Sequence, residues 1–184
     1  LTHPASYNTI LFIIFYRREN IQIMNDTQII VRPFVKADLD DVIKMDEESG
    51  YYVQQWVEDI EIDENNDYSW GIYINNILAG YCTIGYADDV CPVIENHPLH
   101  GDESYLLSDV YMKPEYRHHG YGVKLITETI RGRFKKEEKL PVFLQVFYDK
   151  LKYFYGKAGF EWIPDDKDYS CMVFNPCKES DVTV

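Results

Sequence analysis

The chain of 184 residues is poor in cysteine and in basic side chains, and it has no long apolar run. Its four cysteines form no C-x-x-C pair, which argues against a disulfide scaffold or a zinc ribbon and favours a reducing compartment. The longest apolar run, residues 10–16, is far shorter than the roughly 20 residues that span a bilayer, and no basic stretch precedes it as in a signal peptide. We therefore expect a cytoplasmic protein without a membrane partner.

The shortage of basic residues gives the chain a strong negative charge. Lys and Arg number 18 against 31 Asp and Glu, so the formal net charge is −13. This balance argues against a nucleic-acid-binding protein and against attraction to anionic membranes. Hydrophobic residues make up 46% and aromatic residues 15% of the chain, which is enough to form a packed core in one domain.

The first methionine is Met24, and residues 1–23 differ in composition from the rest. We expect a single domain over residues 24–178, preceded by an N-terminal extension at 1–23 and followed by a tail at 179–184. The alternative for residues 1–23 is a strand or helix that docks on the domain.

From Met24 onward, strand-like and helix-like segments alternate, which predicts an α/β fold with a mostly antiparallel front half and a β-α-β unit near residue 106. Pro33 indicates an edge or the end of a strand, and the pair Asn75–Asn76 predicts a tight hairpin turn. Asp38 is expected to cap the first helix, and residues 87–104 to form a long polar loop. The predicted strands are 28–34, 70–74, 77–86, 106–112, 142–147, 160–163 and 169–174, and the predicted helices are 38–49, 54–62, 120–136 and 150–157.

The most informative segment is residues 108–122, SDVYMKPEYRHHGYG. A strand is followed by a turn at Pro114, and the small residues Gly120 and Gly122 let the backbone pass close to a ligand at the start of a helix. The first amides of a helix have no intrahelical partners and, with the helix dipole, favour an anion such as a diphosphate. The spacing fits neither G-x-G-x-x-G nor a P-loop. The alternative is a strand-to-helix turn that glycine makes possible, without a ligand.

This segment resembles the acetyl-CoA signature R-x-x-G-x-G of the GCN5-related N-acetyltransferases (GNAT family). Residues 30–39 (IVRPFVKADL) resemble the family's opening strand and first helix, and residues 154–160 (FYGKAGF) resemble its closing Y-x-K-x-G-F signature. The resemblance covers about residues 28–174. It implies a mixed, mostly antiparallel twisted sheet that is flanked by about four helices, with acetyl-CoA as co-substrate and no metal.

The resemblance also implies a set of cofactor-binding residues. The backbone of one strand would pair with the pantetheine arm through Val110, Tyr111 and Met112. The side chain of Lys124 would reach the phosphates. The pyrophosphate would be held by the amides that follow the strand: Arg117, His118, His119, Gly120, Tyr121 and Gly122. The other basic residues of this region are expected on a solvated helix face: Arg131, Arg133, Lys135, Lys136 and Lys139.

For catalysis, the resemblance implies that Tyr155 protonates the departing thiolate of coenzyme A. Two residues between Val146 and Tyr155 are missing relative to the family pattern, so Tyr153 is the fallback. An acceptor ammonium has a pKa of about 10, so a base must accept its proton. Asp109 is the first choice, Glu103 the alternative, and a chain of water molecules without a dedicated base the third.

The acceptor is expected to be a small cationic amine. Residues 38–67 hold twelve acidic residues and only one basic residue, Lys44, so this stretch carries −11 of the net charge. By resemblance it flanks the acceptor pocket, where a negative field would concentrate a cation; a solvated helix face is the alternative. Tyr51, Tyr52 and Trp56 would line the pocket or only pack there. Cys91, His97, His100 and Asp102 share a loop, but their spacing fits no common zinc site.

The sequence therefore predicts an acetyl-CoA-dependent N-acetyltransferase in which a primary amine attacks the thioester directly in a ternary complex. The alternative is a coenzyme A-binding sensor or interaction module without turnover. A homodimer is compatible with either, because dimers are frequent in the family.

Overall fold

The computed structural model describes residues 27–50, 68–88, 90–101, 103–136, 139–164 and 170–177. Four sequence predictions lie outside these residues: the extension at 1–23, the acceptor residues Tyr51 and Tyr52 with Trp56, the helix at 54–62, and the tail at 179–184. No helix in the described part of the chain is long and apolar enough to cross a membrane.

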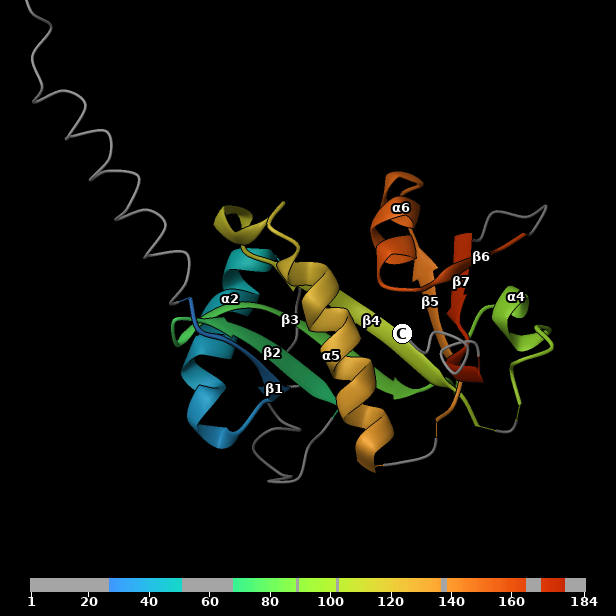
Figure 1. Ribbon diagram of the computed structural model, residues 1–184, viewed down its shortest axis with the longest axis horizontal. Coiled ribbons are helices and arrows are strands. Elements are labelled where there is room, and N and C mark those ends of the chain that lie inside the picture. Colours follow the sequence, from blue (N-terminus) through green and yellow to red (C-terminus); the bar gives the residue numbers. More distant parts are fainter. Residues whose placement is uncertain are drawn as a thin grey trace, which may run out of the picture.

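The described residues form one seven-stranded sheet with the strand order β1-β2-β3-β4-β5-β7-β6 (Figure 1). Neighbouring strands are antiparallel except for β4 and β5, which are parallel and are joined through a helix. The predicted β-α-β unit is thus confirmed. The strands are β1 Ile29–Pro33, β2 Ser69–Ile74, β3 Ile77–Tyr86, β4 Tyr105–Met112, β5 Val142–Val146, β6 Glu161–Ile163 and β7 Ser170–Phe174.

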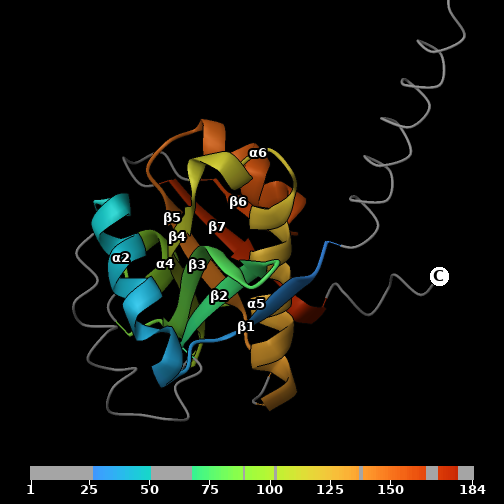
Figure 2. The same cartoon turned by 90° about the vertical axis from the view of Figure 1, so that its left-hand side faces the viewer.

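The helices cover both faces of the sheet (Figure 2). Helices α5, Tyr121–Lys136, and α6, Lys150–Lys157, pack on one face, and α2, Leu39–Ser49, and α4, Pro92–Glu95, lie on the other. Two short 3-10 turns precede α2 and α5, at Lys36–Asp38 and Pro114–Tyr116. We call these two sides the α5/α6 face and the α2/α4 face.

The main core lies between the sheet and α5. Helix α5 approaches the sheet closely at Gly132, where an added Cβ would lie 2.0 Å from the Trp70 ring. Any larger residue at position 132 would force the helix away from the strands. This contact fixes the height of α5 above the sheet, and with it the position of the residues that begin the helix.

The predicted hairpin and edge strand are confirmed. Asn75 and Asn76 both have positive φ, 51° and 66°, as a tight primed turn between β2 and β3 requires. Strand β1 is the edge of the sheet, and Pro33, which has no backbone N–H to donate, is its last residue.

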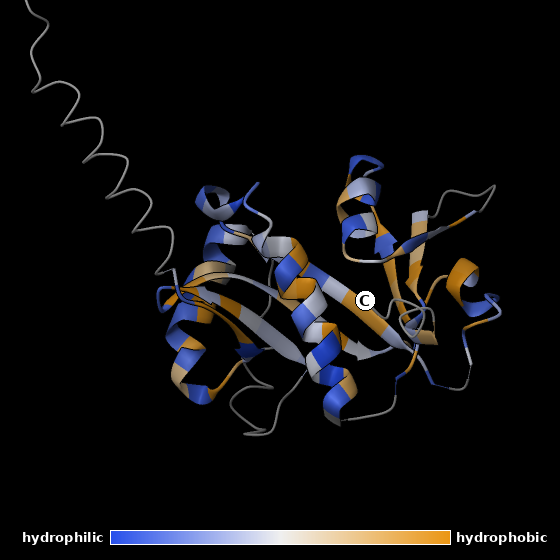
Figure 3. Ribbon diagram, viewed as in Figure 1, coloured by the Kyte–Doolittle hydropathy of each residue, from blue (hydrophilic) through white to orange (hydrophobic). Residues whose placement is uncertain are grey.

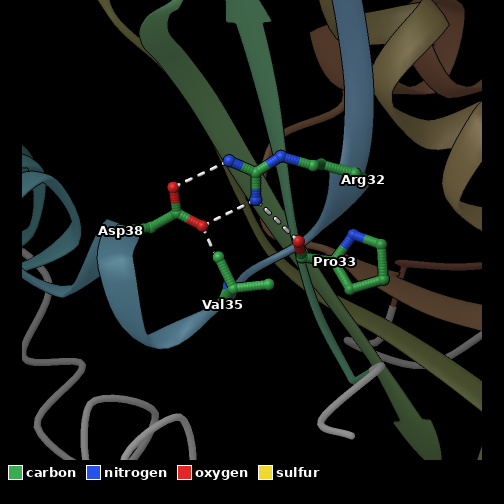
Figure 4. A network of polar contacts seen from close by, with 4 residues as sticks. All are labelled: Arg32, Pro33, Val35 and Asp38. Carbon is green, nitrogen blue, oxygen red and sulfur yellow. Dashed lines mark hydrogen bonds and ion pairs between the residues drawn. The ribbon is translucent and has the colours of Figure 1, made fainter. Parts of the chain in front are cut away.

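Asp38 has a different role from the predicted helix cap (Figure 4). Its carboxylate accepts hydrogen bonds from both terminal nitrogens of Arg32, at 2.6 and 2.8 Å, and from the Val35 N–H at 2.8 Å. Burial raises the pKa of Asp38, but the hydrogen bonds from Arg32 and Val35 outweigh it, and the pKa lies below its usual value. The charge pair ties the end of β1 to the start of α2. Asp38 is the third residue of the 3-10 turn rather than its N-cap, and its bond from the Val35 N–H is the capping-box contact of that turn.

The predicted polar loop at 87–104 contains the short helix α4. Pro92 is suited to its first turn, and Ile94 is buried against β5 and β7 in a cluster with Phe143 and Val173. Figure 3 shows α4 coloured as hydrophobic over most of its length. Sequence patterning missed this element because two adjacent apolar side chains in a four-residue helix show no helical period.

The prediction that Arg133 lies on a solvated helix face is wrong. Its side chain is fully buried, and its guanidinium lies 4.8 Å from the ring centroid of Tyr68 and 5.1 Å from that of Tyr105. Aromatic faces stabilise a cation that has lost its water. Arg131 and Lys135 on the same helix are exposed, as predicted.

Candidate active site

Strand β4 contains a bulge at Asp109, which has a φ of 51°. Tyr81 pairs with Tyr111 and Thr83 with Ser108, so that Asp109 and Val110 together stand opposite Cys82. One extra residue on a strand reverses the alternation of side chains beyond it. Leu107 and Val110 accordingly both pack against the core under α5, although they are three residues apart.

Beyond the start of β4, the parallel pair of strands separates. β4 and β5 pair only through Tyr105 with Val142 and Leu106 with Phe143, and the strands then diverge (Figure 1). In the described part of the chain, residues 107–112 of β4 have no strand partner on this side. Their backbone groups need a hydrogen-bonding partner there. This geometry brings the expected pantetheine residues Val110, Tyr111 and Met112 to an open strand edge.

The segment after β4 makes a compact turn into α5. The Arg117 amide donates to the Pro114 carbonyl at 3.2 Å, and the Arg117 Nε donates to the Met112 carbonyl at 2.8 Å. His118 and Gly120 both have positive φ, 65° and 81°. The Arg117 amide is used within the turn, so of the amides predicted to hold a pyrophosphate those from His118 to Gly122 remain as candidate donors.

The two glycines of the signature have different roles. Gly120 has positive φ and open space around its missing side chain, so its conformation is what requires glycine. An added Cβ at Gly122 would lie 3.1 Å from the Phe154 ring. Gly122 therefore allows α5 and α6 to pack closely, whereas sequence reasoning assigned both glycines to the approach of a ligand.

Replacing Gly120 by Val should weaken the binding of coenzyme A about tenfold. A β-branched residue costs on the order of 1–2 kcal/mol in the left-handed region, so the loop would leave the conformation that presents its amides. Isothermal titration calorimetry with coenzyme A measures the effect. Gly101→Val is the matched control, because Gly101 also has open space but no positive φ. Unchanged affinity of Gly120→Val would show that this loop does not hold the cofactor.

The tyrosine predicted as acid lies on α6 at the α5/α6 face. The Tyr155 ring is half-buried and packs at 4.9 Å from the Phe154 ring and 6.2 Å from the Phe160 ring. Tyr153, the fallback, is 75% exposed, and the Lys157 amino group lies 4.5 Å from its ring centroid. Of the two tyrosines, only Tyr155 is held in a defined position by the core.

Asp109, the predicted base, lies at the α2/α4 face. The Thr83 hydroxyl donates to Oδ2 of Asp109 at 3.2 Å and lies 2.8 Å from the Ser108 hydroxyl. Thr83 stands between Cys82 and Ile84, which both point into the core under α5, so Thr83 points to the opposite face. Burial raises the pKa of Asp109 above its usual value, although its hydrogen bonds with Thr83 and Ser108 offset part of this rise.

Sequence reasoning did not single out Thr83 and Ser108. They are 25 residues apart, and only the register of β3 against β4 brings their hydroxyls together. The alternation of apolar residues around Thr83 was a signal that it faces away from the core. The bulge, which turns Asp109 toward the same side, had no signal in the sequence.

The remaining predicted site residues lie at the two ends of β4. His118, His119 and Lys124 are exposed around the start of α5, close in sequence to Gly120. Glu103 precedes β4, at the end where β4 and β5 still pair. Glu103 therefore stays a candidate base from the opposite end of β4 to the Asp109 bulge.

No group of three or more potential metal ligands is close enough to hold an ion among the residues that the structure describes. The residues at the β4 bulge are hydroxyls, one carboxylate and backbone groups. They can accept and donate protons and bind an extended backbone-like chain.

Comparisons with known proteins show which solved structures share this fold. No curated protein sequence matches the chain significantly. A solved structure of the N-acetyltransferase YlbP from Bacillus subtilis, in complex with coenzyme A, is 18% identical, with a TM-score of 0.52, over 82% of this chain and 97% of that one. The PaiA N-acetyltransferase of Thermoplasma acidophilum, also in complex with coenzyme A, is 21% identical, with a TM-score of 0.53, over 80% and 99%. NAA60 of Arabidopsis thaliana, in complex with a bisubstrate analogue, is 16% identical, with a TM-score of 0.56, over 80% and 98%.

These similarities confirm the predicted fold class, with its mostly antiparallel sheet and about four helices. The model of the acetyltransferase (GNAT) family matches residues 33–160, which run from the last residue of β1 through α6 and include the signature turn and Tyr155. The chain therefore belongs to the GNAT family of N-acetyltransferases, whose co-substrate is acetyl-CoA.

Proposed function

We propose that this enzyme transfers the acetyl group of acetyl-CoA to the primary amine of a small cationic acceptor, by direct attack in a ternary complex. Asp109 acts as the base and Tyr155 as the acid. The observation that carries the proposal is the separation of β4 from β5 next to the Asp109 bulge, with Tyr155 on one face of the sheet and Asp109 on the other.

The separated strands would hold the cofactor. The pantetheine arm has amide groups that can pair with the open edge of β4 at residues 110–112, as a further strand would. The amides at the start of α5 would bind the pyrophosphate, where the helix dipole favours an anion. Acetyl-CoA bound in this way would place its thioester between the strands, with the sulfur on the side of α6.

The acceptor would approach from the α2/α4 face. As the amine nitrogen attacks the thioester carbon, the Asp109 carboxylate accepts a proton from it. As the C–S bond breaks, the Tyr155 hydroxyl donates a proton to the leaving sulfur. The two groups act from opposite faces of the sheet, so the amine and the cofactor need not share an entrance. The bisubstrate analogue bound to Arabidopsis NAA60 joins the two substrates in one molecule, which supports a ternary complex.

The charge of α2 supports a cationic acceptor. Its exposed carboxylates include Asp40, Asp41 and Glu47, and its Glu48 carboxylate lies 3.6 Å from the Lys113 amino group after β4. These groups belong to the acidic stretch 38–67 and cover the same face as Asp109. A negative surface raises the local concentration of a cation.

We expect steady-state assays with acetyl-CoA to show the highest kcat/KM for small polycationic amines. The panel would include a polyamine, an aminoglycoside, a free amino acid and peptides that offer an N-terminus or a lysine, with release of free thiol as the readout. For the best acceptor, kcat/KM should fall several-fold between 0.02 and 0.3 M salt, values chosen because the screening length drops from about 20 to 6 Å. An acceptor of a single charge is the control and should change less.

Double-reciprocal plots of initial rate against acetyl-CoA concentration, at several fixed amine concentrations, should give intersecting lines, as a ternary complex requires. Parallel lines would instead indicate an acetyl-enzyme and would contradict the mechanism. Salt-independent kcat/KM would contradict the cationic acceptor. Tight binding of coenzyme A without turnover of any amine would favour the sensor module.

A further inference from the structure

Two thiols on the α2/α4 face lie almost in contact. The Sγ atoms of Cys91 and Cys171 are 3.3 Å apart, although the residues are 80 positions apart in the sequence. Cys91 immediately precedes α4 and is half-buried, whereas Cys171 lies on β7 and is buried. Neither residue belongs to the site proposed for acetyl transfer.

The surroundings of the pair hold α4 against the sheet by apolar contact. Cys171 shares a buried cluster with Ile94 of α4 and with Phe143 and Ile163 of the neighbouring strands, and Cys91 packs at its margin. α4 has only four residues, so it has little stability of its own. A bond between Cys91 and Cys171 would therefore add a covalent link between residues 90–101 and β7 to these apolar contacts.

The remaining cysteines are unsuited to the same reaction. The Cys82 thiol is fully buried, and burial raises its pKa to about 12 although the Thr129 hydroxyl lies 3.4 Å away. A thiol with such a pKa is not a nucleophile near neutral pH. Cys177 is exposed and follows β7, near the C-terminal limit of the described residues.

We propose that Cys91 and Cys171 are a site of reversible oxidation, which a hydroperoxide converts into a disulfide between α4 and β7. The sulfur atoms must approach by about 1.3 Å to reach a bond length near 2.05 Å. Rotation of the Cys91 side chain, which lies in extended backbone outside a helix or strand, can supply this movement.

The reaction has two steps that balance. The Cys91 thiolate attacks one oxygen of the hydroperoxide, the O–O bond breaks, and the leaving oxygen takes a proton, which gives a sulfenic acid and an alcohol or water. The Cys171 sulfur then attacks the Cys91 sulfur. The S–O bond breaks, the thiol proton goes to the departing hydroxide, and water and the disulfide result. Cys91 reacts first because it is the more accessible of the two.

The disulfide would close a long loop that includes β4, α5 and β5. A cross-link of this span reduces the freedom of the unfolded chain more than a short one does. It should raise the melting temperature on the order of 10 °C for a domain of this size. Reduction with a dithiol should reverse both the bond and the shift.

The test uses the full chain with Cys177→Ser, so that the exposed thiol cannot form links between molecules. The protein is treated with about one equivalent of hydrogen peroxide and is analysed by thiol titration under denaturing conditions, by peptide mass mapping and by thermal unfolding. We expect the loss of two thiols, a linked peptide pair that contains Cys91 and Cys171, and the rise in melting temperature. With Cys91→Ser added, the linked peptide and the shift should both be absent.

The proposal is overturned if both thiols remain free. It is also overturned if Cys91 is recovered as a sulfinic acid while Cys171 stays reduced, or if the linked peptides involve Cys82. Should Cys91→Ser fold poorly, the peptide map of the Cys177→Ser protein decides alone. Acetyl-transfer activity does not enter the readout, so failure here and failure of the proposed function remain distinct.

Discussion

Replacing Tyr155 by Phe should lower kcat about 100-fold, with the KM for acetyl-CoA within about twofold of the original. A general acid contributes a factor of roughly 10² to 10⁴, and the thiolate would have to leave without a proton in the variant. Phe keeps the ring that packs against Phe154 and Phe160, so the fold and the cofactor site should persist. Stopped assays of thiol release, with saturating acetyl-CoA and acceptor, measure the change.

Tyr153→Phe is the matched control for this experiment. Tyr153 lies on the same helix but is 75% exposed, and the variant should retain the original rate. If Tyr155→Phe keeps full activity, Tyr155 is not the acid. If Tyr153→Phe loses activity instead, Tyr153 is the acid. The two residues missing before α6 would then have moved the acid to an earlier position of the sequence than in the family pattern.

Replacing Asp109 by Asn should lower kcat/KM for the amine about 100-fold and should change the pH profile. A carboxylate base works only when it is deprotonated, so activity falls as the pH falls through the pKa of Asp109. Because burial raises this pKa, the fall should occur above the usual value of about 3.9. Asn cannot titrate, so the variant should lack both the base and the fall in activity at low pH, which is the acid limb of the profile. The measurement is kcat/KM over a pH series for the original protein and the variant.

Thr83 offers a sharper test of the same assignment. Thr83→Val removes the hydroxyl that donates to Asp109, and losing a donor to the carboxylate raises its pKa further. The acid limb should therefore move to higher pH while the rate on its plateau stays close to the original, and Thr83→Ser should restore its position. An acid limb that is unchanged in both Asp109→Asn and Thr83→Val would contradict Asp109 as the base and would favour a chain of water molecules.

Most of the fold could be predicted because its signals are local. The asparagine pair sets a hairpin by its tolerance of positive φ, and the alternation of apolar residues places seven strands within one or two residues of their observed ends. The signature at 117–122 marks a strand-to-helix turn because Gly120 must adopt a conformation that other residues avoid. Each of these depends on a few adjacent residues.

Features that depend on distant partners could not be predicted. The burial of Arg133 follows from three tyrosines on other segments, and the role of Gly122 follows from the ring of Phe154, which is 32 positions away in the chain. Asp38 was assigned to its own helix, but its strongest partner is Arg32 on the preceding strand. α4 is short and is stabilised by burial of Ile94 rather than by its own sequence.

Local sequence signals were enough to recognise the family, the order of the elements and the groups available for chemistry: a glycine-containing turn into a helix, a tyrosine near the C-terminal end and an acidic stretch. The tertiary structure decided which way these groups point. One extra residue in β4 reverses the side-chain alternation, and β4 leaves β5 after two pairs, so Asp109 and Tyr155 come to opposite faces of an open strand edge. Strand register is set by the contacts of whole strands, which no local pattern of residues encodes.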